Sequence, residues 1–202
     1  MKNNFLLNSS VGKTLYDRIN NLPIIDYHNH LSLKDLKKNT RFTDIYDLWI
    51  APDPYKHRAM RMCGVEEKYI TGDCDKKEKF LKWCETIPKI VGGPLYHWSH
   101  MEIEFLLDSD DFSWSDESLF EKCNSYLAEN IVTPEVLLKR FNVEYNCPCA
   151  SLLDDIIFCE EKDGLAPSLR GDDIVNLSPE FIKKLSKIIC VVEIESSLFF
   201  IT

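Results

Sequence analysis

The sequence predicts an α/β fold with an incomplete parallel sheet, and three observations support this prediction. A proline-bounded apolar run, residues 23–27, has the pattern of a short buried strand. A long stretch of helical pattern follows it, from about residue 32 to about 141. From residue 143 strand and helix patterns alternate, which is typical of parallel sheets. Three strands, near residues 24, 144 and 167, are too few to close a barrel, which usually takes about 250 residues.

Caps and apolar spacing mark the helices of the first part of the chain. Ser9 or Ser10 caps a first helix that runs to Asn20, and Ser32 caps a short helix. Two further helices are predicted over residues 75–91 and from Pro94 onward. An acidic loop over 108–118 then ends in serines that suit the cap of the next helix.

The later elements are marked by proline and glycine. Thr133 followed by Pro134 is a helix start, because proline fits the first helical position. Strand patterns at 143–147 and 165–169 flank a helical pattern that Gly164 closes, and Ser178 with Pro179 opens a last helix. We therefore expect one partial domain over 1–187, with a helical insertion at about 32–141. We expect residues 188–202 to be a divergent apolar, β-prone tail, which is an aggregation hazard if exposed.

Charge and cysteine usage narrow the function class. The net charge of −9 argues against an electrostatic nucleic-acid surface, and no basic run suits an anionic membrane. The N-terminus lacks the pattern of a signal peptide, and no apolar stretch is long enough to span a membrane. The eight cysteines contain no CxxC pair, so we expect reduced structural thiols in a cytoplasmic protein. A small-molecule substrate is the expected partner.

His28 and His30 are the first candidates for chemistry. At i and i+2 on a strand, both imidazoles leave the same face, and imidazole is a common zinc ligand. The strand end would aim them at the mouth where barrel enzymes keep their active sites. A bare HxH is more often a pair of solvated histidines, since a zinc site needs three or four ligands. With the apolar run and Asp26 before them, a metal site and a pair of solvated histidines are about equally supported.

Other polar clusters are less specific. His97 and His100 lie i and i+3 on a predicted helix, where a polar patch is favoured over a metal site. The basic stretch 54–61 is favoured as a solvated face. Arg170 directly follows a predicted strand, where it can clamp a carboxylate bidentately. No GxGxxG, P-loop or GxSxG motif supports nucleotide or serine-hydrolase chemistry.

Taken together, several motifs resemble those of the uronate (glucuronate) isomerase family of the amidohydrolase superfamily. The motifs that carry the resemblance are LPIIDYHNHLS, YKHRAMR, YITGD, GGPLYHWSHMEI and NVEYNC. They occur in the family's order over about 4–185. PLYHWSH and YITGD are narrow signals, whereas HxH is shared by many amidohydrolases.

The resemblance implies the N-terminal part of a distorted (β/α)₈ TIM-type barrel that binds one divalent metal, with zinc expected. The implied reaction is aldose–ketose isomerisation of hexuronates, glucuronate to fructuronate and galacturonate to tagaturonate. His28 and His30 match the metal ligands. Tyr55 matches a tyrosine placed to shuttle a proton or polarise a sugar oxygen, and Arg170 matches an arginine that holds the substrate. A homo-oligomer is expected only for the full-length form.

The chain also departs from the family pattern. Pro54 stands where the family has a substrate-contacting histidine, and His57 replaces a tryptophan. Residues 148–152 replace a Thr-Thr-Asp-Asp-Pro run at a strand end. Family chains are more than twice as long, so we expect a truncated or frame-shifted N-terminal portion that is inactive alone. The alternatives are a metal-dependent hydrolase, which ammonia release or ring opening would reveal, and a non-catalytic remnant or interaction module.

Overall fold

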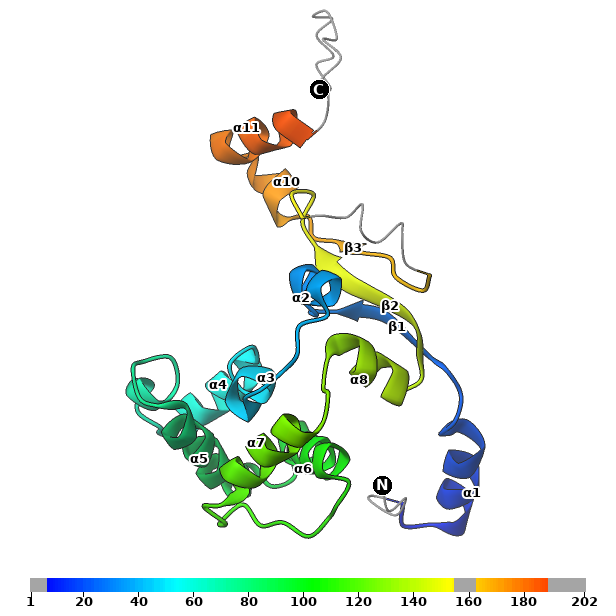
Figure 1. The fold of residues 1–202 in the computed structure, drawn as a ribbon, viewed down its shortest axis with the longest axis vertical. Helices are drawn as coiled ribbons and strands as arrows, with labels where there is room; N and C mark the ends of the chain where they lie inside the picture. Colours follow the sequence, from blue (N-terminus) through cyan, green and yellow to red (C-terminus); the bar gives the residue numbers. More distant parts are fainter. Residues whose placement is uncertain (1–6, 155–162, 189–202) are drawn as a thin grey trace, which may run out of the picture. The chain divides into compact units, whose positions relative to one another are not determined.

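The computed structural model describes residues 7–154 and 163–188, which divide into two compact units (Figure 1). The helical unit comprises residues 1–21 and 41–137, and the sheet unit comprises residues 22–40 and 138–202. No helix in the described part of the chain is both long and apolar enough to cross a membrane.

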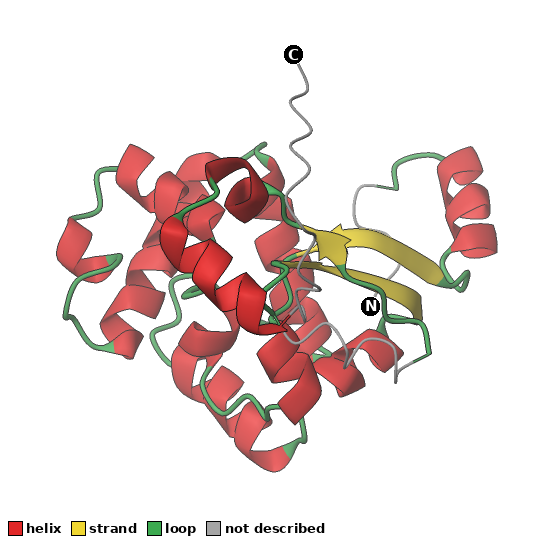
Figure 2. Cartoon of the chain, turned by 90° about the horizontal axis from the view of Figure 1, so that it is seen from above, coloured by secondary structure: helices red, strands yellow, loops and turns green. Residues whose placement is uncertain are grey.

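Three parallel strands form the sheet unit, in the order β1-β2-β3 (Figure 2). β1 spans Ile24–Asn29, β2 spans Val143–Ala150 and β3 spans Ser168–Leu169. Ile24 pairs with Val143, and Cys149 pairs with Ser168. The prediction of three parallel strands near residues 24, 144 and 167 is confirmed. The sheet is open, since β1 and β3 are its edges among the described strands.

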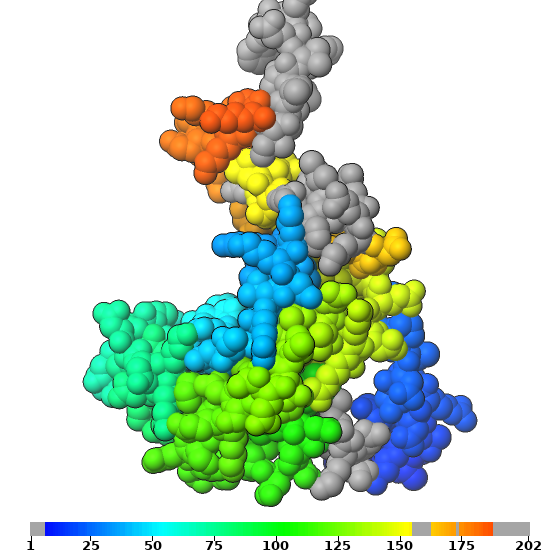
Figure 3. All heavy atoms as spheres, viewed as in Figure 1, coloured from blue at the N-terminus to red at the C-terminus, as the bar shows by residue number. Residues whose placement is uncertain are grey.

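Helix α2, Leu33–Lys38, packs against the C-terminal end of β2 (Figure 3). Ser32 caps α2, its side chain accepting from the Asp35 amide, as predicted. Leu33 and Leu36 pack against Ala150 of β2. After β3 the chain continues through α10, Asp172–Asn176, and α11, Pro179–Ile188, whose cap Ser178 accepts from the Phe181 amide. This small apolar layer holds the end of the sheet that carries the candidate site.

The side chains of the sheet differ in their exposure to solvent. On β2, Asn146, Pro148 and Ala150 are buried, whereas Tyr145 is 41% exposed. On β1, Ile25 is 56% exposed and Tyr27 is 82% exposed. Burying such side chains stabilises a protein by about 1.5–3 kcal/mol each. The strand pattern thus predicts the element correctly, but β1 is not buried as the sequence suggested.

The helical unit is built from helices of 5 to 14 residues: α1 (Ser10–Ile19), α3 (Ile45–Trp49), α4 (Pro54–Met62), α5 (Lys76–Thr86), α6 (Pro94–Leu107), α7 (Leu119–Glu129) and the start of α8 (Pro134–Arg140). Two 3₁₀ turns, Glu67–Tyr69 and Ile87–Ile90, lie among them. The centre of its core is fully buried and holds Phe80, Trp83, Ile87, Leu119 and Leu127. The elements between β1 and β2 are all helices or 3₁₀ turns, and the bounds of the predicted helical insertion, 32–141, stay a prediction.

The predicted helix ends hold in most places and fail in two. Ser9 caps α1 and Asp75 caps α5 through side-chain oxygens, as the pattern indicates. The helix expected over 75–91 ends at Thr86, because Pro88 cannot donate a backbone hydrogen bond and the chain tightens into a 3₁₀ turn. Ser118 does not cap α7, since its hydroxyl donates to Asp116 instead. The helix expected before Gly164 lies mostly outside the described residues.

The cysteines behave as structural thiols. The six that lie in the described ranges, Cys63, Cys74, Cys84, Cys123, Cys147 and Cys149, are all free. Burial raises the pKa of Cys84 far above its usual range and raises the pKa of Cys123 to about 12. Thiols held protonated in this way are poor nucleophiles and poor metal ligands.

The YITGD stretch is explained by packing around the first 3₁₀ turn. Ile70 is 1% exposed, and the Thr71 hydroxyl donates to the Glu67 carboxylate. A Cβ on Gly72 would lie 2.6 Å from the Lys68 Cα, which is backbone and cannot move aside. Only glycine fits this close approach.

We therefore expect Gly72→Ala to destabilise the helical unit by about 1–3 kcal/mol, the usual cost of overpacking. Urea unfolding followed by circular dichroism measures this change. Gly171→Ala is the matched control, because a Cβ there would have nothing within 4 Å. Equal stability of the two variants would contradict the packing explanation.

Candidate functional site

The two histidines of HxH meet at the C-terminal end of β1. The pairing register explains how, because between Asp26 and Asn29 β1 advances three residues while β2 advances only from Asn146 to Pro148. The irregularity is a bulge, a feature that re-aims side chains at strand ends. His28 and His30 are exposed, and their rings lie edge to face with centroids 5.3 Å apart. The proximity expected from their spacing is therefore observed.

A polar network holds the residue between the two histidines. The Asn29 side-chain amide donates to Asp26 Oδ2 at 2.9 Å and also to Asn146 Oδ1, and its carbonyl oxygen accepts from the Leu31 amide at 3.0 Å. Asn146 is 4% exposed, so this network anchors the strand end in the buried layer. The HxH pattern does not indicate Asn29, because the middle position of that motif accepts any residue.

His28 has a partner on the third strand. Its Nδ1 lies 3.1 Å from the Ser168 hydroxyl oxygen, which itself lies 3.4 Å from the Cys147 carbonyl oxygen. These three residues come from three different strands of the sheet. No sequence pattern indicates Ser168, because 140 residues separate it from His28.

His30 and Arg170 line one pocket of about 230 Å³ in the sheet unit. The other residues that line it are Leu31, Ser32, Leu33, Lys34, Cys149 and Asp154. Two cationic side chains, Lys34 and Arg170, and one carboxylate, Asp154, therefore border a site with an imidazole, which leaves the lining net positive. Such a pocket suits a small anionic ligand.

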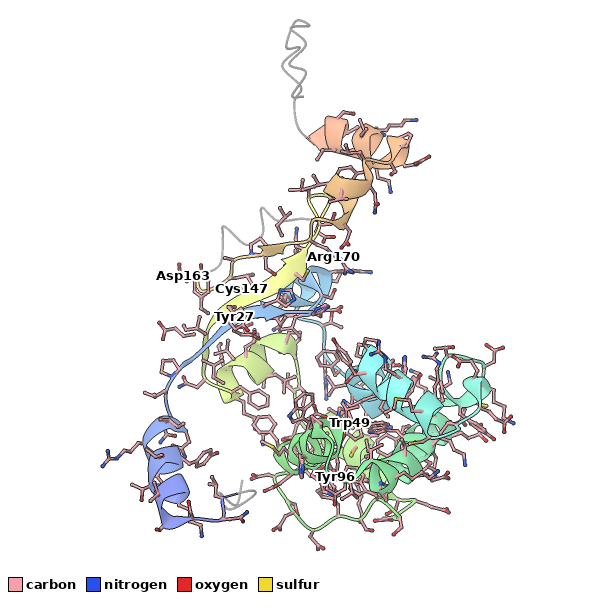
Figure 4. All side chains as sticks on the ribbon, turned by 180° about the vertical axis from the view of Figure 1, so that it is seen from behind. Tyr27, Trp49, Tyr96, Cys147, Asp163 and Arg170 are labelled. Atoms are coloured by element: carbon pink, nitrogen blue, oxygen red, sulfur yellow. The ribbon has the colours of Figure 1, made fainter. Side chains whose placement is uncertain are left out.

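Arg170 follows β3 directly, as the sequence predicts. Its backbone amide donates to the Ala150 carbonyl at 2.8 Å, and its Nε donates to Asp172 Oδ2 at 2.8 Å. The guanidinium beside it lowers the pKa of Asp172. Figure 4 shows Arg170 beyond β3, with Cys147 on β2 and Tyr27 on β1. The sheet thus positions the arginine through its backbone and through one carboxylate.

Tyr55 belongs to the helical unit, whereas His28, His30 and Arg170 belong to the sheet unit. It is the second residue of α4 and is 64% exposed, with its amide donating to the cap Asp53 at 2.9 Å. Next to it Lys56 is 3% exposed, and its ammonium donates to the Trp49 carbonyl and to Glu102. A rigid helix start therefore presents the Tyr55 phenol to solvent.

The remaining histidines lie in the helical unit. In His100, Nδ1 lies 2.7 Å from the Tyr96 carbonyl and Nε2 accepts from the Trp114 indole at 2.7 Å, so both nitrogens are used. A fully hydrogen-bonded ring has no lone pair for a metal, which fits the polar-patch interpretation. Burial, and next the Arg61 charge, lower the pKa of His57.

The donor set at the end of β1 fits two ligands of a divalent metal. Neutral imidazole suits zinc and its neighbours, and a catalytic zinc site uses three protein ligands. Within residues 7–154 and 163–188, no group of three or more histidine, cysteine, aspartate or glutamate side chains is gathered. The described residues therefore offer a pair of candidate ligands, His28 and His30, and not a whole metal site.

Comparison with known proteins identifies the lineage. The family model described as glucuronate isomerase matches residues 1–199 of the 202, nearly the whole chain. The chain belongs to the glucuronate isomerase family. The match extends into the segment 188–202, of which only Ile188 lies in the described residues, so the divergence of this segment from the family stays a prediction.

Curated relatives carry the same family name. The uronate isomerase of Staphylococcus haemolyticus is 40% identical over 195 residues, which cover 91% of this chain and 42% of the relative. The uronate isomerase of Caldicellulosiruptor bescii is 38% identical over 202 residues, covering 93% and 43%. The chain therefore spans about two fifths of the length of the uronate isomerases it matches.

Solved structures agree on the fold. The uronate isomerase of Thermotoga maritima superposes with a TM-score of 0.81 at 29% identity, covering 93% of this chain and 44% of that one. The glucuronate isomerase of Caulobacter crescentus gives a TM-score of 0.77 at 22% identity, covering 87% and 40%. The mixed α/β fold with parallel strands is thus the fold of the matching part of these isomerases.

Proposed function

We propose that this chain carries the first strands of a (β/α)₈ barrel and, with them, the metal-binding and substrate-binding end of a hexuronate isomerase. The observation that carries the proposal is the shared pocket of His30 and Arg170, where a metal-ligand type and a carboxylate-binding type meet. The reaction is the interconversion of glucuronate with fructuronate, or of galacturonate with tagaturonate. Membership of the glucuronate isomerase family supports this reaction class.

His28 and His30 would hold a divalent metal, with zinc as the expected ion. Their rings lie close together on one strand end, and the Asn29 network fixes the backbone between them. When bound, such an ion supplies Lewis-acid polarisation of sugar oxygens. The remaining ligands are not among the described residues.

Arg170 would bind the hexuronate carboxylate. The guanidinium offers paired donors that match the two oxygens of a carboxylate, and Asp172 holds it from the Nε side. Lys34 adds a second positive charge at the same pocket. Binding at this end leaves C1 and C2 of the sugar to the catalytic groups.

The isomerisation itself moves one proton from C2 to C1 through an enediol, while a second proton passes between the two oxygens. We assign Tyr55 to this second task, as a phenol that donates to or accepts from a sugar oxygen. Its exposure and its place at a capped helix start leave the hydroxyl available for that task.

A chimera tests the proposal. It joins residues 1–187 of this chain to the part of the Staphylococcus haemolyticus uronate isomerase that lies beyond the aligned position. We expect it to convert glucuronate to fructuronate, and we expect the 202-residue chain alone to show no turnover, since its described residues provide only two metal ligands. Turnover by the chain alone would contradict the second expectation, and a folded, metal-loaded but inactive chimera would contradict the proposal.

In this chimera, Arg170→Lys is expected to raise the KM for glucuronate by about 10-fold or more, because a hydrogen bond to a charged group contributes about 1.5–3 kcal/mol. Lysine keeps the charge but loses the fork that grips two oxygens. Steady-state kinetics with both hexuronates measures the change. Lys187→Arg, in α11, is the matched control and is expected to leave KM unchanged. An unchanged KM in the Arg170 variant would remove this residue from the binding site.

A further inference from the structure

We propose that Ser168 is a positioning residue that fixes the tautomer of His28 and so makes Nε2 of this histidine the metal-binding nitrogen. The proposal rests on the metal site of the proposed function. It adds a residue and a mechanism to that site, since Ser168 acts on the metal only through the imidazole.

The contacts of Ser168 with His28 and with the Cys147 carbonyl indicate where the Ser168 hydroxyl proton points. The Ser168 hydroxyl has one proton, and the Cys147 carbonyl, 3.4 Å away, can only accept. With that proton directed to the carbonyl, the hydroxyl oxygen is left as an acceptor for the ring nitrogen 3.1 Å away. His28 Nδ1 then carries its hydrogen and donates, so the lone pair lies on Nε2. A neutral imidazole in water favours the opposite tautomer, with the hydrogen on Nε2.

The sheet explains why the serine can hold this position. Before Ser168 the Ala166 amide donates to the Asn146 carbonyl at 3.1 Å, and after it the Arg170 amide donates to the Ala150 carbonyl at 2.8 Å, so β3 is fastened to β2 on both sides of the contact. The serine hydroxyl is one rotatable bond from the backbone, so it is not carried on a flexible side chain. Histidine ligands in metal sites commonly donate their second nitrogen to such a partner, which orients the ring.

Strand β3 therefore positions two side chains of the site, those of Ser168 and Arg170. Ser168 lies two residues before Arg170, so β3 places the hydroxyl at the His28 ring and the guanidinium in the His30 pocket. A shift of this strand would disturb the metal-binding histidine and the carboxylate-binding arginine together. The arrangement couples ligand orientation to substrate binding through a single backbone segment.

The tautomer can be measured directly on the ¹⁵N-labelled 202-residue chain. Long-range ¹H–¹⁵N correlation at about pH 8.5, where an ordinary imidazole is neutral, distinguishes a protonated Nδ1 from a protonated Nε2. His28→Asn identifies the signals. We expect Nδ1–H in the unaltered chain, Nε2–H in Ser168→Ala, and a return to Nδ1–H in Ser168→Thr, which keeps the hydroxyl.

Ser186→Ala is the matched control, because that hydroxyl donates to the Lys183 carbonyl within α11 and is expected to leave the His28 tautomer unchanged. An Nε2–H signal in the unaltered chain, or one tautomer shared by the unaltered chain and Ser168→Ala, would overturn the proposal. Ser168→Thr guards against a folding artefact, since loss of the tautomer there with a dispersed spectrum would also count against it.

A second measurement concerns the metal. Competition with a chromophoric chelator gives the zinc affinity of the chimera, which Ser168→Ala is expected to lower by about 10–100-fold and Ser168→Thr to restore. An unchanged affinity in Ser168→Ala overturns the positioning role. Failure of the proposed isomerase function looks different, as a chimera that binds zinc with the expected serine dependence but forms no ketose.

Discussion

Trp83→Ala is expected to lower the free energy of unfolding of the helical unit by about 3–5 kcal/mol, the usual cost of truncating a buried aromatic side chain. Trp83 is 0% exposed and packs edge to face against Trp49, with ring centroids 6.4 Å apart. Its removal leaves a cavity at the centre of the core that α5 shares with its neighbours. Urea unfolding followed by circular dichroism at 222 nm measures the loss.

Two control variants make this prediction specific. Trp98, on α6, is 55% exposed, so Trp98→Ala is expected to change stability by less than about 0.5 kcal/mol. Trp83 Nε1 is buried with no hydrogen-bond partner among the described residues, so Trp83→Phe removes an unsatisfied donor and should cost less than Trp83→Ala. Similar losses for Trp83→Ala and Trp98→Ala would contradict the assignment of the core.

The second large effect concerns the metal. In the chimera, His28→Ala and His30→Ala are each expected to reduce bound zinc to background and turnover by more than about 100-fold, since removing even a partner of a ligand costs 10–100-fold. Metal analysis of the purified protein and a glucuronate assay measure the two effects. Both histidines lie exposed at the strand end, so stability should change little.

His57→Ala is the matched control for these variants. It removes an imidazole from α4 of the helical unit and is expected to leave zinc content unchanged. Full zinc content in the His28 or His30 variant would assign the ion to other ligands. Loss of zinc in the His57 variant would show that the ion does not depend on the strand end alone.

The fold was predictable where local chemistry decides it. Caps such as Ser9, Ser32 and Asp75 act within one turn, so their side-chain hydrogen bonds follow from sequence spacing. The three parallel strands were predictable because apolar runs alternate with helical patterns. Where a second local partner competes, the prediction failed, as at Ser118, whose hydroxyl bonds Asp116.

The candidate site was predictable only in part. His28, His30 and Arg170 each follow a strand pattern, and strand ends on one edge of a parallel sheet come together. Ser168 and Asn29 act through partners on other strands, so only the pairing register reveals them. The register in turn depends on a bulge, which no local pattern marks.

The structure also explains the departures from the family pattern. Pro54 occupies the first turn of α4 behind the Asp53 cap, where proline stabilises the helix start. Pro148 is fully buried in the sheet, and Cys149 lines the pocket of His30 and Arg170. Of residues 148–152, Cys149 alone lines this pocket.

We propose that residues 1–187 carry the metal-binding and substrate-binding end of a hexuronate isomerase. The most direct test is ketose formation from glucuronate by the zinc-loaded chimera, followed by proton NMR in D₂O. We expect fructuronate at a rate that Arg170→Lys lowers at limiting substrate and that His28→Ala abolishes. A folded chimera that binds zinc and forms no fructuronate, or one whose rate is unchanged in both variants, would contradict it.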